Sequence, residues 1–289
     1  MVKSPYNKVA SDAFNALQLD AGMLLSNFDF ANPYAEPADA DILATTTGGI
    51  NAVCEPTYED LGEDVDNVPN NTKELLMLTG WNCRVEFTSI KFNATNAAWA
   101  LGAADEIDAP TGAPTGTVRI VPRAGVKQTD FKNLYAAFPM ADGGIYVKMV
   151  KNALSTGGMN VQTSKNGKGT NKMTITGYIS INDQDTMPME DVFIPPLTLL
   201  TVVSAAGTTT GKTAITVTGH SLGTGETYVY KISTSEISVD VGDSTTAWTS
   251  WDGTAEITAE TGKIITVAVA KSSKVVTYGS TTVTAKAGT

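Results

Sequence analysis

Residues 44–92 read ATTTGGINAVCEPTYEDLGEDVDNVPNNTKELLMLTGWNCRVEFTSIKF and carry the strongest long-range pattern of the chain. Two extended arms, 46–58 and 79–92, flank an acidic connection. Thirteen extended residues span about 43 Å at roughly 3.3 Å each, whereas an ordinary strand has five or six residues. The pattern predicts a long β-hairpin that projects beyond its own domain.

The two arms differ in their side-chain alternation. In the second arm Trp81, Cys83, Val85 and Phe87 share one face and polar residues share the other, which is the period of a half-buried strand. The first arm has a similar apolar face, but Pro56 cannot donate a hydrogen bond to a neighbouring strand. We therefore expect the first arm to be an edge strand or to end early.

Length and charge limit the possible classes of protein. A chain of 289 residues predicts two domains, because single cores stop growing near that size. The net charge is −10, and residues 1–195 carry 23 acidic and 14 basic groups. An acidic surface repels phosphate, so specific nucleic-acid binding through a basic patch is not expected. Passive contact with DNA that slides past remains possible.

The cysteine content and the apolar runs point to a compartment. Cys54 and Cys83 lie on the apolar faces of the two arms, and we expect core thiols rather than a disulfide. So few cysteines suit synthesis in a reducing compartment. The longest strongly apolar run, 197–203, is too short to span a bilayer, and the N-terminus lacks a signal-peptide pattern. No membrane association is expected.

The rest of residues 1–194 predicts a mainly β domain with one short helix. Residues 1–18 are weakly patterned and read as an arm, and Asn93 or Thr95 can cap a helix over 94–104. Residues 105–117 read as a loop. The spacing in 129–139 fits a helix and a strand equally well, so its conformation stays open.

The last part of the first domain shows the clearest strand signals. Residues 145–150 alternate, the pair Asn166–Gly167 predicts a hairpin turn, and residues 173–181 continue as its return strand. Residues 193–196 (FIPP) then read as a stiff linker, with the two prolines at 195–196 separating the two domains.

Residues 197–289 have the composition of a small β-sandwich. Thr, Ser, Val and Gly dominate, and short strands recur between glycine-containing turns. We predict strands at 197–204, 214–218, 228–232, 255–258, 264–270 and 282–285. An immunoglobulin-like (Ig-like) module fits this spacing, although the paired cysteines of antibody domains are missing.

Two motifs resemble a catalytic or a phosphate-binding site, but the residues around each of them do not support that function. Residues 219–223 (GHSLG) spell the hydrolase nucleophile elbow, but His220 is the single histidine of the chain and lies inside the elbow, so a separate base is lacking. Residues 207–213 (GTTTGKT) resemble a phosphate loop that is one residue short, and a strand rather than a helix follows. We expect turns at both places.

Two further features are weighed in the same way. The carboxylates at 59–66 do not follow the spacing of an EF-hand calcium loop, so no metal site is expected. Trp248 and Trp251 could stack on a sugar, but a core role in a small sandwich is the simpler interpretation. We therefore predict no catalytic residues, no cofactor and no bound metal.

Several stretches resemble one family, the major tail proteins that form the tail tube of long, non-contractile-tailed phages of Gram-positive bacteria. The similar segments occur in the family's order and cover most of residues 17–194. They are LDAGMLLSNFDF (19–30), ATTTGGINAVCEPTYEDLGEDVDNVPNNTKEL (44–75), LGAADE (101–106), RIVPRAGVKQTDFKNLY (119–135), KNALSTGGMNVQTSKNGKGT (151–170) and TGYISINDQDTMPMEDVFI (176–194). Beyond Pro195 the chain is similar to the Ig-like domains that some of these proteins carry outside the tube.

The resemblance implies a tail-tube sandwich or barrel over 1–194 and an exterior Ig-like domain over 197–289. It implies a non-enzymatic virion protein whose hexameric rings stack into a tube around a tape-measure protein and later pass DNA. Tail terminator and distal tail proteins are further implied partners. The residues that would contact the next ring or line the lumen are acidic: Glu55, Glu59, Asp60, Glu63, Asp64 and Asp66.

The alternative function comes from another class, a surface adhesin or carbohydrate-binding β-sandwich protein, suggested by the Thr- and Ser-rich second domain. A serine hydrolase, suggested by Ser221, is the third class.

Overall fold

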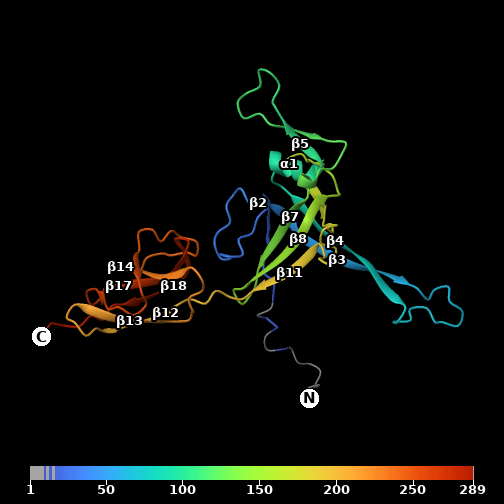
Figure 1. The fold of residues 1–289 in the computed structure, drawn as a ribbon. Helices are drawn as coiled ribbons and strands as arrows, with labels where there is room; N and C mark the ends of the chain where they lie inside the picture. Colours follow the sequence, from blue (N-terminus) through green and yellow to red (C-terminus); the bar gives the residue numbers. More distant parts are fainter. Residues whose placement is uncertain (1–9, 11–12, 15–16, 289) are drawn as a thin grey trace, which may run out of the picture. The chain divides into compact units, whose positions relative to one another are not determined.

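The computed structural model describes Ala10, residues 13–14 and residues 17–288, and it confirms a mainly β protein (Figure 1). The chain divides into two compact units between Pro195 and Pro196. Residues 29–37 belong to the second unit, whereas the sequence reading assigned them to the first domain. The predicted N-terminal arm, 1–18, lies mostly outside the described residues.

The first unit is built around one continuous antiparallel sheet in the order β2-β1-β7-β8-β10-β4-β3, with β11 on β8 and β9 on β10. Its strands are β1 (Met23–Leu25), β2 (Ile42–Ala44), β3 (Thr46–Asp60), β4 (Leu76–Ser89), β7 (Lys132–Pro139), β8 (Ile145–Ser155), β9 (Asn160–Gln162), β10 (Thr170–Thr176) and β11 (Met189–Ile194). A separate hairpin joins β5 (Ala104–Ile107) to β6 (Arg119–Pro122).

Strand β8 connects the two halves of this sheet. Its residues 145–150 pair with β7 and β11, whereas Leu154 and Ser155 pair with β10. The sheet therefore folds over, and side chains of both halves meet in one core. That core includes Leu134 and Val150 from one half and Val85 and Met173 from the other.

Helix α1 (Ala94–Leu101) covers the core. The sequence predicted a short helix over 94–104, and the observed helix ends three residues earlier. The Asn93 side chain accepts a hydrogen bond from the Asn96 backbone at 2.8 Å, which is the expected N-cap. Trp99 and Ala100 are buried on its inner side. Gly102 ends the helix at a φ of +70°, a conformation that suits glycine.

Three predictions for the first unit need correction. Residues 104–107 form β5, although 105–117 was predicted to be loop throughout. Strand β10 ends at Thr176, so the predicted return strand over 173–181 is five residues too long. Phe193 and Ile194 belong to β11, which pairs with β8, and are not part of a linker.

The second unit is a two-sheet sandwich. One sheet has the order β12-β13-β16 and the other β15-β14-β17-β18. The strands are β12 (Thr201–Ala206), β13 (Lys212–Thr218), β14 (Glu226–Ser233), β15 (Thr249–Trp251), β16 (Ile257–Thr258), β17 (Ile264–Lys271) and β18 (Lys274–Thr282). Ile215 from the first sheet and Val267 from the second meet in the core.

The predicted strands of this unit match five observed ones with shifted ends, and the last is misplaced. Strand β18 ends at Thr282, where the sequence reading began its final strand, because it pairs closely with β17. Strand β15 was missed.

Candidate assembly surface

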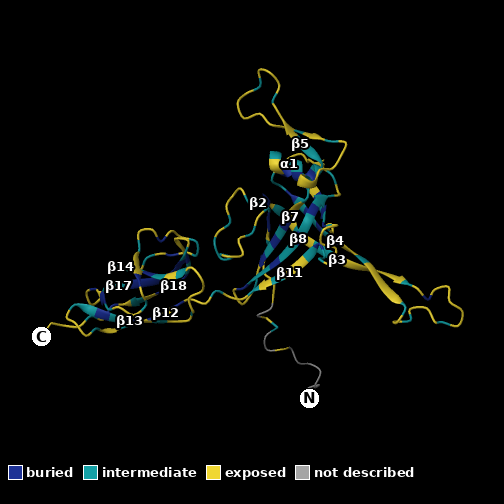
Figure 2. Ribbon diagram, viewed as in Figure 1, coloured by how far each residue is buried: buried dark blue, intermediate teal, exposed yellow. Residues whose placement is uncertain are grey.

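The distal half of the β3–β4 hairpin, residues 53–82, is an arm that projects from the first unit (Figures 1 and 2). Over the whole hairpin, strands β3 and β4 pair with each other from Thr46↔Ser89 to Asp60↔Leu76. The prediction that the first arm is an edge strand is confirmed, because β3 ends the sheet. Residues beyond the bulge between Thr57 and Tyr58 are mostly exposed, although Gly62 is buried.

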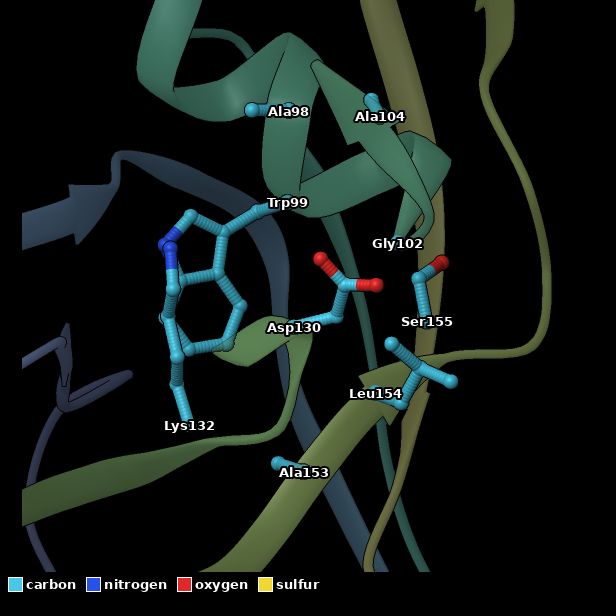
Figure 3. Close-up of a pocket in the computed structure, with 9 residues that line it drawn as sticks. All are labelled: Ala98, Trp99, Gly102, Ala104, Asp130, Lys132, Ala153, Leu154 and Ser155. Carbon is cyan, nitrogen blue, oxygen red and sulfur yellow. The ribbon is translucent and has the colours of Figure 1, made fainter. Parts of the chain in front are cut away.

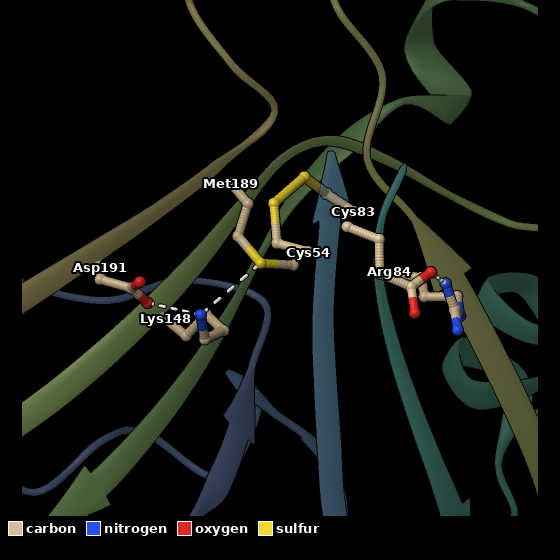
Figure 4. Close-up of a disulfide and its surroundings, with 7 residues drawn as sticks. Cys54, Cys83, Arg84, Lys148, Met189 and Asp191 are labelled. Carbon is tan, nitrogen blue, oxygen red and sulfur yellow. Dashed lines mark hydrogen bonds and ion pairs between the residues drawn. A yellow bond between two sulfur atoms is a disulfide. The ribbon is translucent and has the colours of Figure 1, made fainter. Parts of the chain in front are cut away.

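A disulfide joins Cys54 to Cys83 at the base of the arm (Figure 4), which contradicts the predicted pair of core thiols. The two residues are direct cross-strand partners, so their side chains share one face. Cys83 is buried, whereas Cys54 is exposed because β3 has no further strand beside it. The disulfide thus marks the point where the arm leaves the core.

The core-facing side of the hairpin continues along the arm as an apolar stripe. Val85 and Phe87 are buried in the core on this face. Further out, cross-strand pairing places Pro56 opposite Trp81 and Tyr58 opposite Leu78 on the same side. These side chains are exposed, with 36% for Trp81 and 54% for Tyr58, because no other part of the unit covers them.

The stripe belongs to a wider apolar population on the arm. Seven of its large hydrophobic side chains are at least one third exposed: Tyr58, Leu61, Val65, Leu76, Met77, Leu78 and Trp81. Sets of this size on one projecting element mark contact surfaces rather than ordinary scattered exposure.

The opposite face of the hairpin is polar. The Arg84 guanidinium bonds to Glu55 (Nη1 to Oε2, 2.9 Å) and to Glu86 (Nε to Oε1, 2.9 Å). Arg84 holds the pKa of the Glu86 carboxyl below its ordinary value. Glu55, one of the predicted contact residues, is therefore already engaged within the chain. The polar face needs no partner to satisfy these charges.

The tip of the arm is organised by Asp60. Its Oδ1 accepts the Gly62 N–H at 2.9 Å and its Oδ2 accepts the Asn71 N–H at 2.6 Å. These bonds hold the pKa of the Asp60 carboxyl below its ordinary value. Asp60 is thus a structural residue of the tip as well as a predicted contact residue.

The other predicted contact residues are exposed on the same arm. Glu59 stands opposite Met77, and Glu63, Asp64 and Asp66 lie in the connection beyond Asp60. The structure therefore brings all six predicted residues onto one element. Sequence reasoning missed the apolar stripe, although Tyr58 and Trp81 fall on the face that the alternation defined. Leu78 joins that face only because the bulge between Thr57 and Tyr58 shifts the register of β4, and the sequence pattern does not show this bulge.

The hydrolase-like motif and the phosphate-loop-like motif both lie in connections between strands, as the sequence predicted. Ser221 is exposed in a loop that leads into β14, and residues 207–211 connect β12 to β13. The His220 ring contacts the Glu226 carboxylate (Nε2 to Oε2, 2.8 Å), and Glu226 also accepts the Gly223 N–H at 2.8 Å. Glu226 therefore braces this loop. Although burial opposes it, these bonds lower the pKa of the Glu226 carboxyl.

The two tryptophans of the second unit are part of its packing. Trp251 is buried and donates its ring N–H to the Ala255 carbonyl at 2.8 Å. Trp248 is half-buried against a second small cluster that includes Val239 and Val275. The sugar-stacking interpretation of this pair is therefore not supported by their positions.

Two hollows among the described residues are small or open. One of about 50 Å³ lies beneath α1 (Figure 3), where the Lys132 ammonium lies 5.6 Å from the centre of the Trp99 ring and Asp130 faces inward. It is well below the 300 Å³ or more of typical ligand sites. A second, open hollow of about 390 Å³ in the second unit is bordered by Glu236, Asp240 and Tyr278.

Across Ala10, 13–14 and 17–288, no group of three or more His, Cys, Asp and Glu residues is arranged to hold a metal ion. Within the same residues, no helix is long and apolar enough to cross a membrane.

Comparison with known proteins yields little likeness. No protein-family model matches the chain, and no curated protein matches it. Among solved structures, the chain is similar to domains 7, 8 and 9 of the S-layer protein SbsC, at 16% identity and a TM-score of 0.27. The match covers 71% of this chain and 71% of that one.

Proposed function

We propose that this protein is a structural subunit that polymerises through its β3–β4 arm, and that the polymer is the tail tube of a non-contractile phage tail. The observation that carries the proposal is the apolar stripe, in which the core-facing side of the hairpin continues into solvent at Trp81, Tyr58 and Leu78. A large exposed apolar surface on a projecting element is what a subunit needs to contact a neighbour.

The energetics favour a repeated contact. Complete burial of a large side chain contributes about 1.5–3 kcal/mol, and the three side chains of the stripe are only 36–54% exposed, so covering all three contributes roughly 2–4 kcal/mol. Association costs about 4–15 kcal/mol in lost freedom, so one arm gives a weak pair. When several subunits are already joined in a ring, the translational and rotational freedom is lost only once when two rings stack, whereas every arm contributes its contact. Stacking of rings then becomes favourable.

The finer parts of the proposal follow from the resemblance described above. Rings of six would stack around a tape-measure protein, with tail terminator and distal tail proteins at the ends and the virion tail as the location. The net charge of −10 suits a conduit, because DNA adheres where lysine and arginine neutralise its phosphates.

Electron microscopy of the purified full chain tests the proposal. A series of rising protein concentrations should yield rings or tubes in negative stain. Persistent monomers at all concentrations, with or without the tail-initiation proteins, would contradict the proposed function.

A variant with Tyr58→Thr, Leu78→Thr and Trp81→Thr should fold but remain unassembled, because threonine keeps the strand and removes the apolar surface. The matched control is Val118→Thr with Val121→Thr, two exposed apolar residues in or next to β6 that lie outside the arm. The control should assemble like the wild type. Normal tubes from the stripe variant would show that another surface makes the contact.

A further inference from the structure

The first unit carries a basic surface that complements the arm. Residues 143–182 contain five lysines and no acidic residue, although the whole chain is acidic. Lys165 and Lys168 lie in the turn between β9 and β10, and Lys172 lies in β10. All three side chains are exposed. We call residues 159–172 the basic hairpin.

Most other basic side chains of this unit are already paired. Arg84 bonds to two glutamates, and Arg123 bonds to Asp105 and Asp130. Lys148 and Lys151 pair with carboxylates of β11. The basic hairpin is thus the place where clustered positive charge remains available to a partner.

The basic hairpin also exposes apolar side chains. Met159 is 40% exposed and Val161 is 47% exposed. The exposed ring of Phe92 lies beside the turn, where its Cε2 atom would be 3.7 Å from a Cβ placed on Gly169. This surface therefore combines apolar and positive groups, whereas the arm combines apolar and negative ones: residues 53–82 contain seven acidic residues and one lysine.

The two surfaces lie at opposite ends of the same strands. Strand β4 begins at the tip with Leu76 and ends at Ser89, which pairs with Asn171 of β10. The turn of the basic hairpin extends beyond that pair. The strand alone separates the two ends by about 43 Å at roughly 3.3 Å per residue. The arm therefore cannot reach the basic hairpin of its own chain.

We propose that the acidic arm of one copy docks on the basic hairpin of the next copy, so that subunits join head to tail. Complementary surfaces at opposite ends form a heterologous contact that repeats without closing, which is the requirement for a growing tube. The inference rests on the proposed function, and it specifies which two surfaces meet. Because part of the attraction is electrostatic, added salt weakens it.

Reciprocal charge reversal tests the pairing. One variant carries Glu59→Lys, Glu63→Lys and Asp64→Lys, which avoids the structural residue Asp60. The other carries Lys165→Glu and Lys168→Glu in the turn, and it keeps Lys172, which interacts with Glu86 of the same chain. Each variant alone should need about tenfold more protein to assemble, or about 1.4 kcal/mol per contact, because like charges then meet. Lys231→Glu in the second unit is the control and should assemble normally.

Mixing the two variants in equal amounts distinguishes docking from a general charge effect. In the mixture, the arm of the first variant, now basic, can dock on the hairpin of the second variant, now acidic. The unaltered acidic arm of the second variant can dock on the unaltered basic hairpin of the first. The mixture should therefore assemble at nearly the wild-type concentration. Failure of the mixture, or normal assembly of each variant alone, would overturn the pairing while wild-type tubes keep the proposed function. Absence of wild-type assembly would overturn both.

Discussion

The Oδ2 atom of Asp60 accepts the backbone N–H of Asn71 at 2.6 Å, although the two residues are 11 positions apart. With the bond from Gly62, one carboxylate closes the tip of the arm. Asp60→Ala should therefore speed hydrogen exchange at these two amides without changing the thermal midpoint of the unit, whose core lies elsewhere. Asp64→Ala, at an exposed tip position, is the control. Unchanged exchange in the Asp60 variant would contradict this role.

The same bonds give the tip a pH dependence. They hold the pKa of the Asp60 carboxyl below its ordinary value of 3.8. The ordering that the carboxylate provides is complete above that value and is lost as the pH falls through the lower folded-state pKa. Amide exchange or proton resonances of Gly62 and Asn71, followed from neutral pH downward, should show loosening only in that acidic range. Loosening near neutral pH would contradict the assignment.

The disulfide at the base of the arm makes a stability prediction. Cys54 and Cys83 are separated by 29 positions, and a closed loop of this size stabilises a fold by about 3–4 kcal/mol in the chain-entropy model. Cys54→Ser with Cys83→Ser should lower the unfolding free energy of the first unit by roughly this amount in oxidising buffer. Adding reductant should lower the wild type equally and leave the variant unchanged. Two titratable thiols in the oxidised, denatured wild type would refute the bond.

Most strands could be predicted from sequence because alternation reports burial, but pairing decides where a strand ends. Residues 177–181 continue the alternation of β10, yet Ile181 is 82% exposed. A Cβ on Gly177 would lie 2.8 Å from the Val150 side chain and 2.9 Å from the Pro188 carbonyl oxygen. Residues of β8 and the segment before β11 therefore occupy the space beside Gly177. Val150 and Pro188 are 27 and 11 positions from Gly177, so the local pattern of residues 173–181 does not show that they end the strand.

The open choice at 129–139 was settled in the same way. The buried side chains of β7, Leu134, Ala136 and Phe138, follow a period of two. Pairing with β1 on one side and β8 on the other selects the strand, and aromatic spacing alone cannot reveal either partner.

Of the candidate surface, the sequence predicts the acidic residues but not the apolar stripe. The carboxylates of the tip are visible in any reading of the sequence. The apolar stripe is not, because Trp81 has the same alternation as the buried Val85 and Phe87. Only the end of the neighbouring strand β10, which pairs as far as Arg84, shows that the face beyond is uncovered.

The core of the second unit offers a prediction that separates folding from assembly. Trp251 is buried between the two sheets, so Trp251→Ala should cost about 3–5 kcal/mol in the unfolding free energy of that unit. The matched change Trp248→Ala, at a half-buried position, should cost less. Calorimetry of each variant should show one shifted transition and one unshifted. A shift of both transitions would mean that the two units unfold as one.

Deletion of residues 196–289 should leave assembly intact. The buried core of the first unit, from Leu24 to Ile175, contains no residue of the second unit, and the arm and the basic hairpin both belong to the first. The truncated chain loses the partner of residues 29–37, so faster exchange is expected in that segment. Tubes of the truncated chain, narrower in outline than those of the full chain, would fit an exterior second domain. A folded truncated chain that no longer assembles would instead show that the second unit takes part in the contacts between copies.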